Sequence, residues 1–176
     1  MRPEHVADEP NGMSVEVNGI AHIQLNVNKL ESLEFWERLC HFLEMKTLIS
    51  SEDVRYCIGS RTGILVRLAP VGKRDQPFDQ DRCGLHHLCF RARRREDVDA
   101  IHAFAVAALR ARIIHPPEAG EQFAPGYYSV LLEDPDGIRI EVNFVPGKGH
   151  FGDSGRLGPG GAGPASGYGS DGLTDA

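Results

Sequence analysis

The sequence predicts an α+β fold in which two βαβββ modules place their mixed sheets side by side as one curved wall, a cup with the helices on its outer face. Three observations predict it. A strand that carries His22 has a counterpart that carries His87, each strand precedes a stretch with helical periodicity, and each stretch precedes short apolar runs typical of strands. Since one module is too small to bury its sheet alone, we expect the two sheets to lie side by side, with their polar faces lining a cup.

The chain divides by composition into a central domain and two terminal segments. The first segment is polar and acidic, and we expect a flexible arm. The last is rich in glycine and has almost nothing apolar to bury, so we expect it to be disordered. The predicted parts are the arm at 1–17, module 1 at 18–71, a linker at 72–83, module 2 at 84–146 (the whole domain being 18–146) and the tail at 147–176.

Composition excludes several classes of protein. The 176 residues, 41% of them hydrophobic, can bury a sizeable core. The net charge of −6 and the absence of a basic stripe argue against nucleic-acid binding. No apolar run approaches the roughly 20 residues that span a bilayer, so we expect no membrane segment. The cysteines form no Cys-x-x-Cys pair and follow no secretory leader, which predicts reduced thiols in a cytoplasmic protein.

The first module begins with a strand in which Ile23, Leu25 and Val27 share one face. Asn28 is expected to cap the helix that follows. The apolar positions of this helix recur at helical spacing and are Leu30, Leu33, Trp36, Leu39, Cys40 and Leu43. Three strands are expected after the helix, at 46–49, 54–58 and 64–68.

The second module repeats this order, with the His87 strand, a helix at 96–110, and strands at 112–114, 127–132 and 138–144. The last two strands are joined by Asp134-Pro135-Asp136-Gly137, in which proline suits the first turn position and glycine takes a positive φ. This three-residue hairpin loop with a bulge sets the register of the two strands, in which Leu131 faces Glu141 and Ser129 faces Asn143.

Strand parity selects three candidate metal ligands, His22, His87 and Glu141, because each lies on the face opposite the apolar residues of its strand. Two imidazoles and one carboxylate bind a divalent first-row ion and leave coordination positions open. A structural zinc site usually has four protein ligands, often cysteines, so this composition suits catalysis. Each residue alone would be an ordinary solvated or hydrogen-bonded side chain, whereas their coincidence in a repeat favours one metal ion, with Fe, Mn, Zn and Ni all open.

Other polar residues on the same faces are candidates for substrate contacts, namely Gln24, Arg67, Tyr127, Ser129 and Asn143. Arg67 has three open roles, since it could pair with Glu141, bind an anionic substrate, or be a solvated strand residue. Cys89 shares the face of His87 and is either a packing thiol or a ligand. No residue stands out as the general base.

Three segments, Ala21–Leu25, Gly84–Phe90 and Asp134–Glu141, resemble the vicinal oxygen chelate superfamily, which includes glyoxalases, extradiol dioxygenases, epimerases and the fosfomycin and bleomycin resistance proteins. The resemblance covers about residues 18–146. It implies paired βαβββ modules around a divalent metal, ligated here by His22, His87 and Glu141, which the substrate chelates through two neighbouring oxygens. His86 is expected to point away from the cup. The cup forms within one chain or by exchange of modules in a homodimer.

Two departures from family members bear on the reaction. Arg67 stands where glyoxalase I and the related epimerase carry a fourth ligand, and a protonated guanidinium cannot ligate a cation. Leu131 stands where extradiol dioxygenases and fosfomycin resistance proteins commonly carry a tyrosine. The resemblance therefore implies a metal-dependent enzyme of lyase, isomerase or extradiol dioxygenase type that acts on a small molecule. The alternative is a protein that binds an antibiotic or another small molecule without turnover, as resistance proteins do.

Overall fold

The computed structural model describes residues 17, 19–59 and 62–146. The predicted arm, apart from Val17, and the predicted tail lie outside the described residues. The first module contains β1 (His22–Val27), α1 (Leu30–Phe42), β2 (Lys46–Ser50), β3 (Val54–Ile58) and β4 (Gly63–Leu68). The second contains β5 (Leu88–Arg91), α2 (Arg95–Phe104), β6 (Arg112–Ala119), β7 (Tyr128–Glu133) and β8 (Arg139–Phe144). Both have the order βαβββ, which confirms the predicted fold class.

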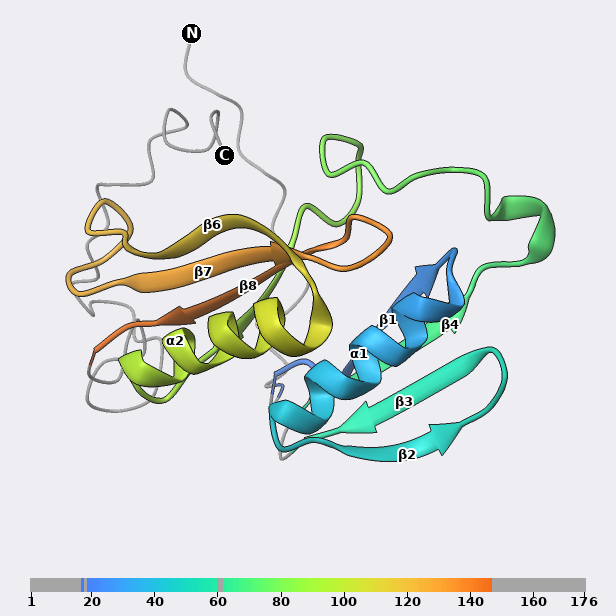
Figure 1. The fold of residues 1–176 in the computed structure, drawn as a ribbon, viewed down its shortest axis with the longest axis horizontal. Helices are drawn as coiled ribbons and strands as arrows, with labels where there is room; N and C mark the ends of the chain where they lie inside the picture. Colours follow the sequence, from blue (N-terminus) through green and yellow to red (C-terminus); the bar gives the residue numbers. More distant parts are fainter. Residues whose placement is uncertain (1–16, 18, 60–61, 147–176) are drawn as a thin grey trace, which may run out of the picture.

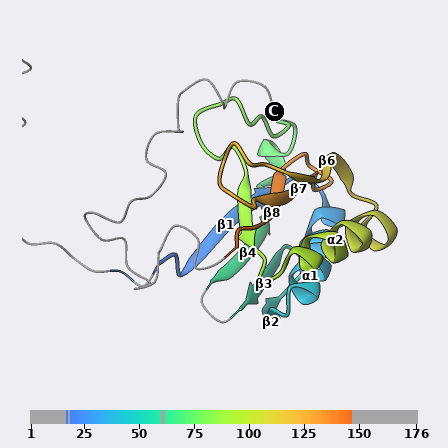
Figure 2. The same ribbon diagram turned by 90° about the vertical axis from the view of Figure 1, so that its left-hand side faces the viewer.

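Each module forms its own mixed four-stranded sheet (Figure 1). The strand orders are β1-β4-β3-β2, called sheet A, and β5-β8-β7-β6, called sheet B. In each sheet the first strand pairs in parallel with the last strand of its module, and the other pairs are antiparallel. Figure 2 shows α1 and α2 together on one side of the molecule, with β1, β4 and β8 toward the other. β1 and β5 are therefore edge strands of two separate sheets.

The core lies between each helix and its sheet, where strand alternation places the apolar side chains. In β1, Leu25 and Val27 are buried while His22, Gln24 and Asn26 are exposed. The largest fully buried side chains include Trp36, Leu33 and Leu39 of α1, Val98 of α2, and Val130, Leu132, Ile140 and Val142 of sheet B. Removal of this apolar surface from water is the main stabilising contribution to the fold.

Two element boundaries differ from those expected. The helix predicted at 96–110 is α-helical only to Phe104 and continues as a π-helical turn, η3 (Ala105–Leu109), which ends at Arg110 in the left-handed region with φ 53°. β6 runs five residues beyond the predicted Ile114, through Pro116 and Pro117. It is an edge strand paired only with β7, so prolines that cannot donate a hydrogen bond are tolerated there.

The predicted register of the last hairpin is confirmed. Leu131 lies opposite Glu141, and Ser129 lies opposite Asn143. The turn has Gly137 at φ 87°, and the Asp134 amide donates to the Ile138 carbonyl at 3.0 Å. Turn chemistry alone thus determines which side chains of β7 face Glu141.

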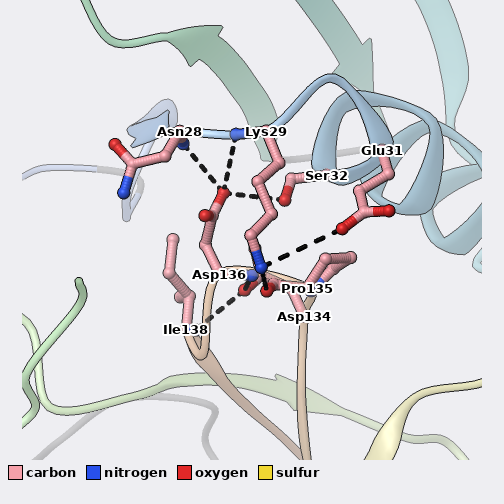
Figure 3. Close-up of polar contacts among 8 residues, drawn as sticks. All are labelled: Asn28, Lys29, Glu31, Ser32, Asp134, Pro135, Asp136 and Ile138. Carbon is pink, nitrogen blue, oxygen red and sulfur yellow. Dashed lines mark hydrogen bonds and ion pairs between the residues drawn. The ribbon is translucent and has the colours of Figure 1, made fainter. Parts of the chain in front are cut away.

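The β7–β8 turn also joins the two modules (Figure 3). The expectation that Asn28 caps α1 is wrong, because α1 has no side-chain cap of its own. Instead Asp136 Oδ2 accepts hydrogen bonds from the backbone amides of Asn28 at 2.8 Å and Lys29 at 3.2 Å, and from Ser32 Oγ at 2.7 Å. A carboxylate at this place satisfies free amides and complements the helix dipole. Sequence inspection could not find it, since the partners are 108 positions apart.

Beside this contact, the buried Trp36 Nε1 donates to Asp134 Oδ2 at 2.8 Å. Asp134 Oδ1 accepts from the amides of Asp136 at 2.9 Å and Ile138 at 2.8 Å. Phe42 and Phe104 stack with ring centroids 4.0 Å apart. The modules are thus held together on their helical side, and we call the Asp134 and Asp136 contacts with α1 the inter-module clasp.

Asp136→Ala is expected to lower the free energy of unfolding by about 1–2 kcal/mol, because the N-terminus of α1 loses its only side-chain acceptor in the described structure. Urea denaturation followed by tryptophan fluorescence measures the loss. Asp75→Ala, at an exposed position of the connection between the modules, is the matched control. Equal unfolding free energies for the two variants would show that the clasp adds nothing.

Within the described ranges, no helix has both the length and the apolar character needed to cross a membrane.

Candidate functional site

Glu141 of β8 is the centre of a polar cluster on sheet B. Its Oε2 lies 3.1 Å from His87 Nε2, and its Oε1 accepts a hydrogen bond from the Tyr127 hydroxyl. The side chains of His87 and Glu141 are 33% and 14% exposed. Two of the three predicted metal ligands are therefore in contact at a site that solvent still reaches.

Strand pairing explains why these residues meet. β5 runs parallel to β8 with Cys89 opposite Glu141, and His87 lies two residues before Cys89, just outside the strand. Tyr127 immediately precedes β7, whose register with β8 places Ser129 opposite Asn143. His87 and Tyr127, just before β5 and β7, consequently converge with Glu141 of β8 at sheet B.

Hydrogen bonds hold Glu141 in its ionised form. Burial would raise the pKa of this carboxyl, but the hydrogen bonds from His87 and Tyr127 outweigh it, and the pKa lies below its usual value. Burial and the hydrogen bond to Glu141 raise the pKa of the Tyr127 hydroxyl, which therefore stays protonated and donates. The carboxylate is the form that can ligate a cation.

The predicted substrate-contact residues of module 2 lie around this carboxylate. Asn143 Nδ2 donates to the Tyr127 hydroxyl at 3.1 Å, and the Tyr127 ring contacts Phe123 with centroids 5.1 Å apart. Ser129 is half-buried opposite Asn143. Tyr127, Ser129 and Asn143 are thus placed together, although the structure does not test whether they bind substrate.

Cys89 lies close enough to Glu141 for the carboxylate to affect it. Partial desolvation of the sulfur and the neighbouring Glu141 charge raise the pKa of its thiol, although the residue as a whole is exposed. A protonated thiol is a poor metal ligand, since thiolate is the ligating form. This environment disfavours the role of ligand, and Cys89 is not among the core residues.

His86 Nδ1 lies 2.7 Å from His87 Nδ1, with the rings nearly perpendicular at 78°, and the orientation of His86 away from the cup stays a prediction. That prediction assumes that both histidines belong to the strand. β5 begins only at Leu88, so strand parity does not apply to them. The Gly84 that precedes them, at φ 146°, is the one sequence signal of an irregular backbone there.

The site residues predicted in module 1 lie on sheet A. His22 and Gln24 are exposed on β1, and the His22 ring meets Tyr56 edge to face at a centroid distance of 6.3 Å. Arg67 is exposed on β4, opposite Asn26. Within the described ranges the Arg67 side chain has neither a hydrogen bond nor an ion pair, and the side-chain partners of Glu141 are His87, Tyr127 and Cys89.

In the part of the chain that the structure describes, no three side chains of His, Cys, Asp or Glu lie close enough to hold a metal ion. His87 and Glu141 form two corners of the predicted set, and His22 lies on the other sheet. The three-ligand site therefore remains a prediction.

Among the described residues, two cavities lie away from this cluster. One, of about 650 Å³, is lined by α1 and the β7–β8 turn, and the other, of about 410 Å³, by the end of β1 and the connection between the modules. Neither is lined by His22, His87 or Glu141.

Residues 19–142 match the Glyoxalase/Bleomycin resistance protein/Dioxygenase superfamily. A putative glyoxalase from Bacillus halodurans is 27% identical with a TM-score of 0.63, covering 73% of this chain and 96% of that chain. A glyoxalase/bleomycin resistance protein from Albidiferax ferrireducens T118 is 22% identical with a TM-score of 0.57, covering 72% and 98%. A lactoylglutathione lyase from Agrobacterium tumefaciens is 19% identical with a TM-score of 0.52, covering 73% and 94%. No curated protein matches the chain.

Proposed function

The chain belongs to the glyoxalase/bleomycin resistance protein/dioxygenase superfamily, and from this premise we propose that it is a divalent-metal-dependent enzyme for a small molecule with two neighbouring oxygens. The observation that carries the proposal is the 3.1 Å contact between His87 Nε2 and Glu141 Oε2. Strand parity on β8 selects Glu141 as a ligand, and the contact adds His87, which lies just before β5.

The residues at this contact suit a metal ion. An imidazole nitrogen and an ionised carboxylate are ligand types that Fe, Mn, Zn and Ni accept, and both side chains are partly open to solvent. His22 would be the third ligand. When bound, the ion would supply Lewis acidity toward the vicinal oxygens of the substrate.

The protein's own residues would orient the ligands and the substrate. Tyr127 holds one oxygen of Glu141 and leaves the other facing His87, while Asn143 fixes the Tyr127 hydroxyl. Ser129 and Asn143 on sheet B, with Gln24 on sheet A, would offer hydrogen bonds to substrate oxygens. The exposed side chain of Arg67, which has no side-chain partner among the described residues, would bind an anionic group of the substrate.

Elemental analysis of the purified chain, followed by turnover assays, tests this function. We expect one equivalent of a divalent metal and turnover in a panel of α-hydroxy carbonyl compounds or, by oxygen uptake, of catechols. His87→Ala should lose both metal and turnover, whereas His115→Ala, on β6 of the same sheet, should keep both.

A protein that sequesters its ligand would give a different result. If the protein binds a small molecule tightly without metal and without turnover, and His87→Ala leaves this binding unchanged, the protein is a binding protein and not an enzyme.

A separate experiment tests whether all three ligands come from one chain. Either His22 of the same chain completes the site, or a second copy of the chain supplies it. In a mixture of His22→Ala and Glu141→Gln chains, recovered metal binding identifies the second arrangement, because only a site shared between chains can then have all three ligands.

A further inference from the structure

The larger cavity, of about 650 Å³, lies between the two modules and has no part in the proposed function. It is lined on one side by α1, and on the other by the end of η3, the start of β6 and the β7–β8 turn. Figure 3 shows this turn facing the start of α1. Small-molecule sites have volumes of roughly 300–1,000 Å³. The cavity is thus large enough for a small ligand that contacts both modules.

The carboxylates that module 2 contributes to the cavity already have partners. Glu133 accepts a hydrogen bond from Arg112 Nη1 at 3.0 Å. Asp134 and Asp136 are occupied by their hydrogen bonds in the inter-module clasp. These three groups stabilise the wall of the cavity and leave little negative charge for a ligand.

Three other charged side chains at the cavity have no side-chain partner among the described residues, namely Glu34 and Arg38 of α1 and Arg110 at the end of η3. All three are exposed. Glu34 and Arg38 are four residues apart, a spacing at which side chains can pair on a helix, yet no ion pair joins them in the described structure. The other carboxylate of α1 at the cavity, Glu31, lies 3.9 Å from Lys29 Nζ. The cavity thus presents two free guanidiniums and one free carboxylate.

Arg110 has a backbone conformation that arginine rarely adopts. Its φ is 53° and its ψ is 35°, in the left-handed region where glycine and asparagine are the usual residues at a helix end. A residue that tolerates such a conformation poorly, at the wall of a cavity, indicates a role for its side chain.

We propose that this cavity is a second binding site, for a small amino dicarboxylic acid such as glutamate. The two carboxylates of the ligand bind Arg38 and Arg110, since a guanidinium can bind a carboxylate through two parallel hydrogen bonds. The ammonium of the ligand binds Glu34. Its methylene groups lie against Phe35 and Leu109, two apolar residues of the wall. A ligand of this charge pattern matches the three free groups one for one.

Isothermal titration calorimetry of the full chain with L-glutamate tests the proposal. We expect one site per chain, at which glutarate binds about 10-fold more weakly because it lacks the ammonium. Glu34→Gln should abolish this difference, because it removes the charge that binds the ammonium. Equal affinities of the wild-type chain for glutamate and glutarate would contradict the proposal.

Arg110→Gly is the sharpest variant, because glycine favours the left-handed backbone and the substitution removes only the side chain. L-glutamate should bind Arg110→Gly and Arg38→Ala at least about 10-fold more weakly than the wild type. Arg93→Ala, which removes an exposed arginine just before α2, is the matched control and should bind L-glutamate as the wild type does.

Glu141→Gln separates this site from the proposed metal site, since carboxylates are also metal ligands. This variant should bind L-glutamate with unchanged affinity. The proposal fails if the wild type binds no L-glutamate at millimolar concentration. It also fails if Glu141→Gln loses the binding while Arg38→Ala and Arg110→Gly retain it, because the ligand then binds at the Glu141 cluster.

Discussion

Glu141→Gln is expected to lower the affinity for a divalent ion by at least about 100-fold. A neutral amide removes the charge of the ligand and cannot accept two hydrogen bonds while it also binds a cation. In the structure this carboxylate contacts His87 and Tyr127 with its two oxygens, so the substitution disturbs the whole cluster. Competition with a chromogenic chelator measures the affinity.

Glu118→Gln is the matched control, since it removes the same charge from an exposed position of sheet B. It should bind metal as the wild type does. If both variants retain the ion equally, Glu141 is not a ligand, and the contact with His87 is only a structural ion pair.

Asp134→Ala is expected to lower the free energy of unfolding at pH 5 by about 3 kcal/mol. Asp134 is 5% exposed and accepts hydrogen bonds from Trp36 Nε1 and from the amides of Asp136 and Ile138. Alanine leaves these donors without their acceptor in a buried place. Chemical denaturation measures the loss, and Trp36→Phe, which removes one donor instead, should cost less.

The effect of Asp134 depends on pH in a defined direction. Burial raises the pKa of this carboxyl from 3.8 to about 6, against the hydrogen bonds that lower it. The folded state thus binds the proton more tightly than the unfolded state, and the stabilisation is complete below pH 4 and is lost as the pH rises through 6. A shift of this size corresponds to about 3 kcal/mol. The loss caused by Asp134→Asn should therefore be larger at pH 4 than at pH 7, and a constant loss would contradict the shift.

Sequence patterns within each module were sufficient to predict the order of its helix and strands and the part of the candidate site that lies on β8 and beside β7. Alternation along β8 assigned Glu141 to the polar face, and the Asp134–Gly137 turn fixed the register that places Tyr127 beside it. Both inferences depend on residues close together in the chain, where backbone geometry determines which way side chains point.

The contacts between distant segments could not be predicted in this way. The cap of α1 comes from Asp136 of the other module, which no helix signal near Asn28 reveals. The position of His86 depends on where β5 begins. The place of His22 relative to Glu141 depends on how two separate sheets are arranged, and strand parity determines the face of a residue but not its distance from another sheet.

X-ray absorption spectroscopy of the bound metal tests the three-ligand site most directly, because the fine structure of the spectrum reports how many imidazoles surround the ion. A site made by His22, His87 and Glu141 predicts two imidazoles with nitrogen at about 2.0–2.1 Å and no sulfur, if the ion is zinc. His22→Ala should reduce the count to one. Sulfur at about 2.3 Å, or an imidazole count that His22→Ala leaves unchanged, would contradict the account.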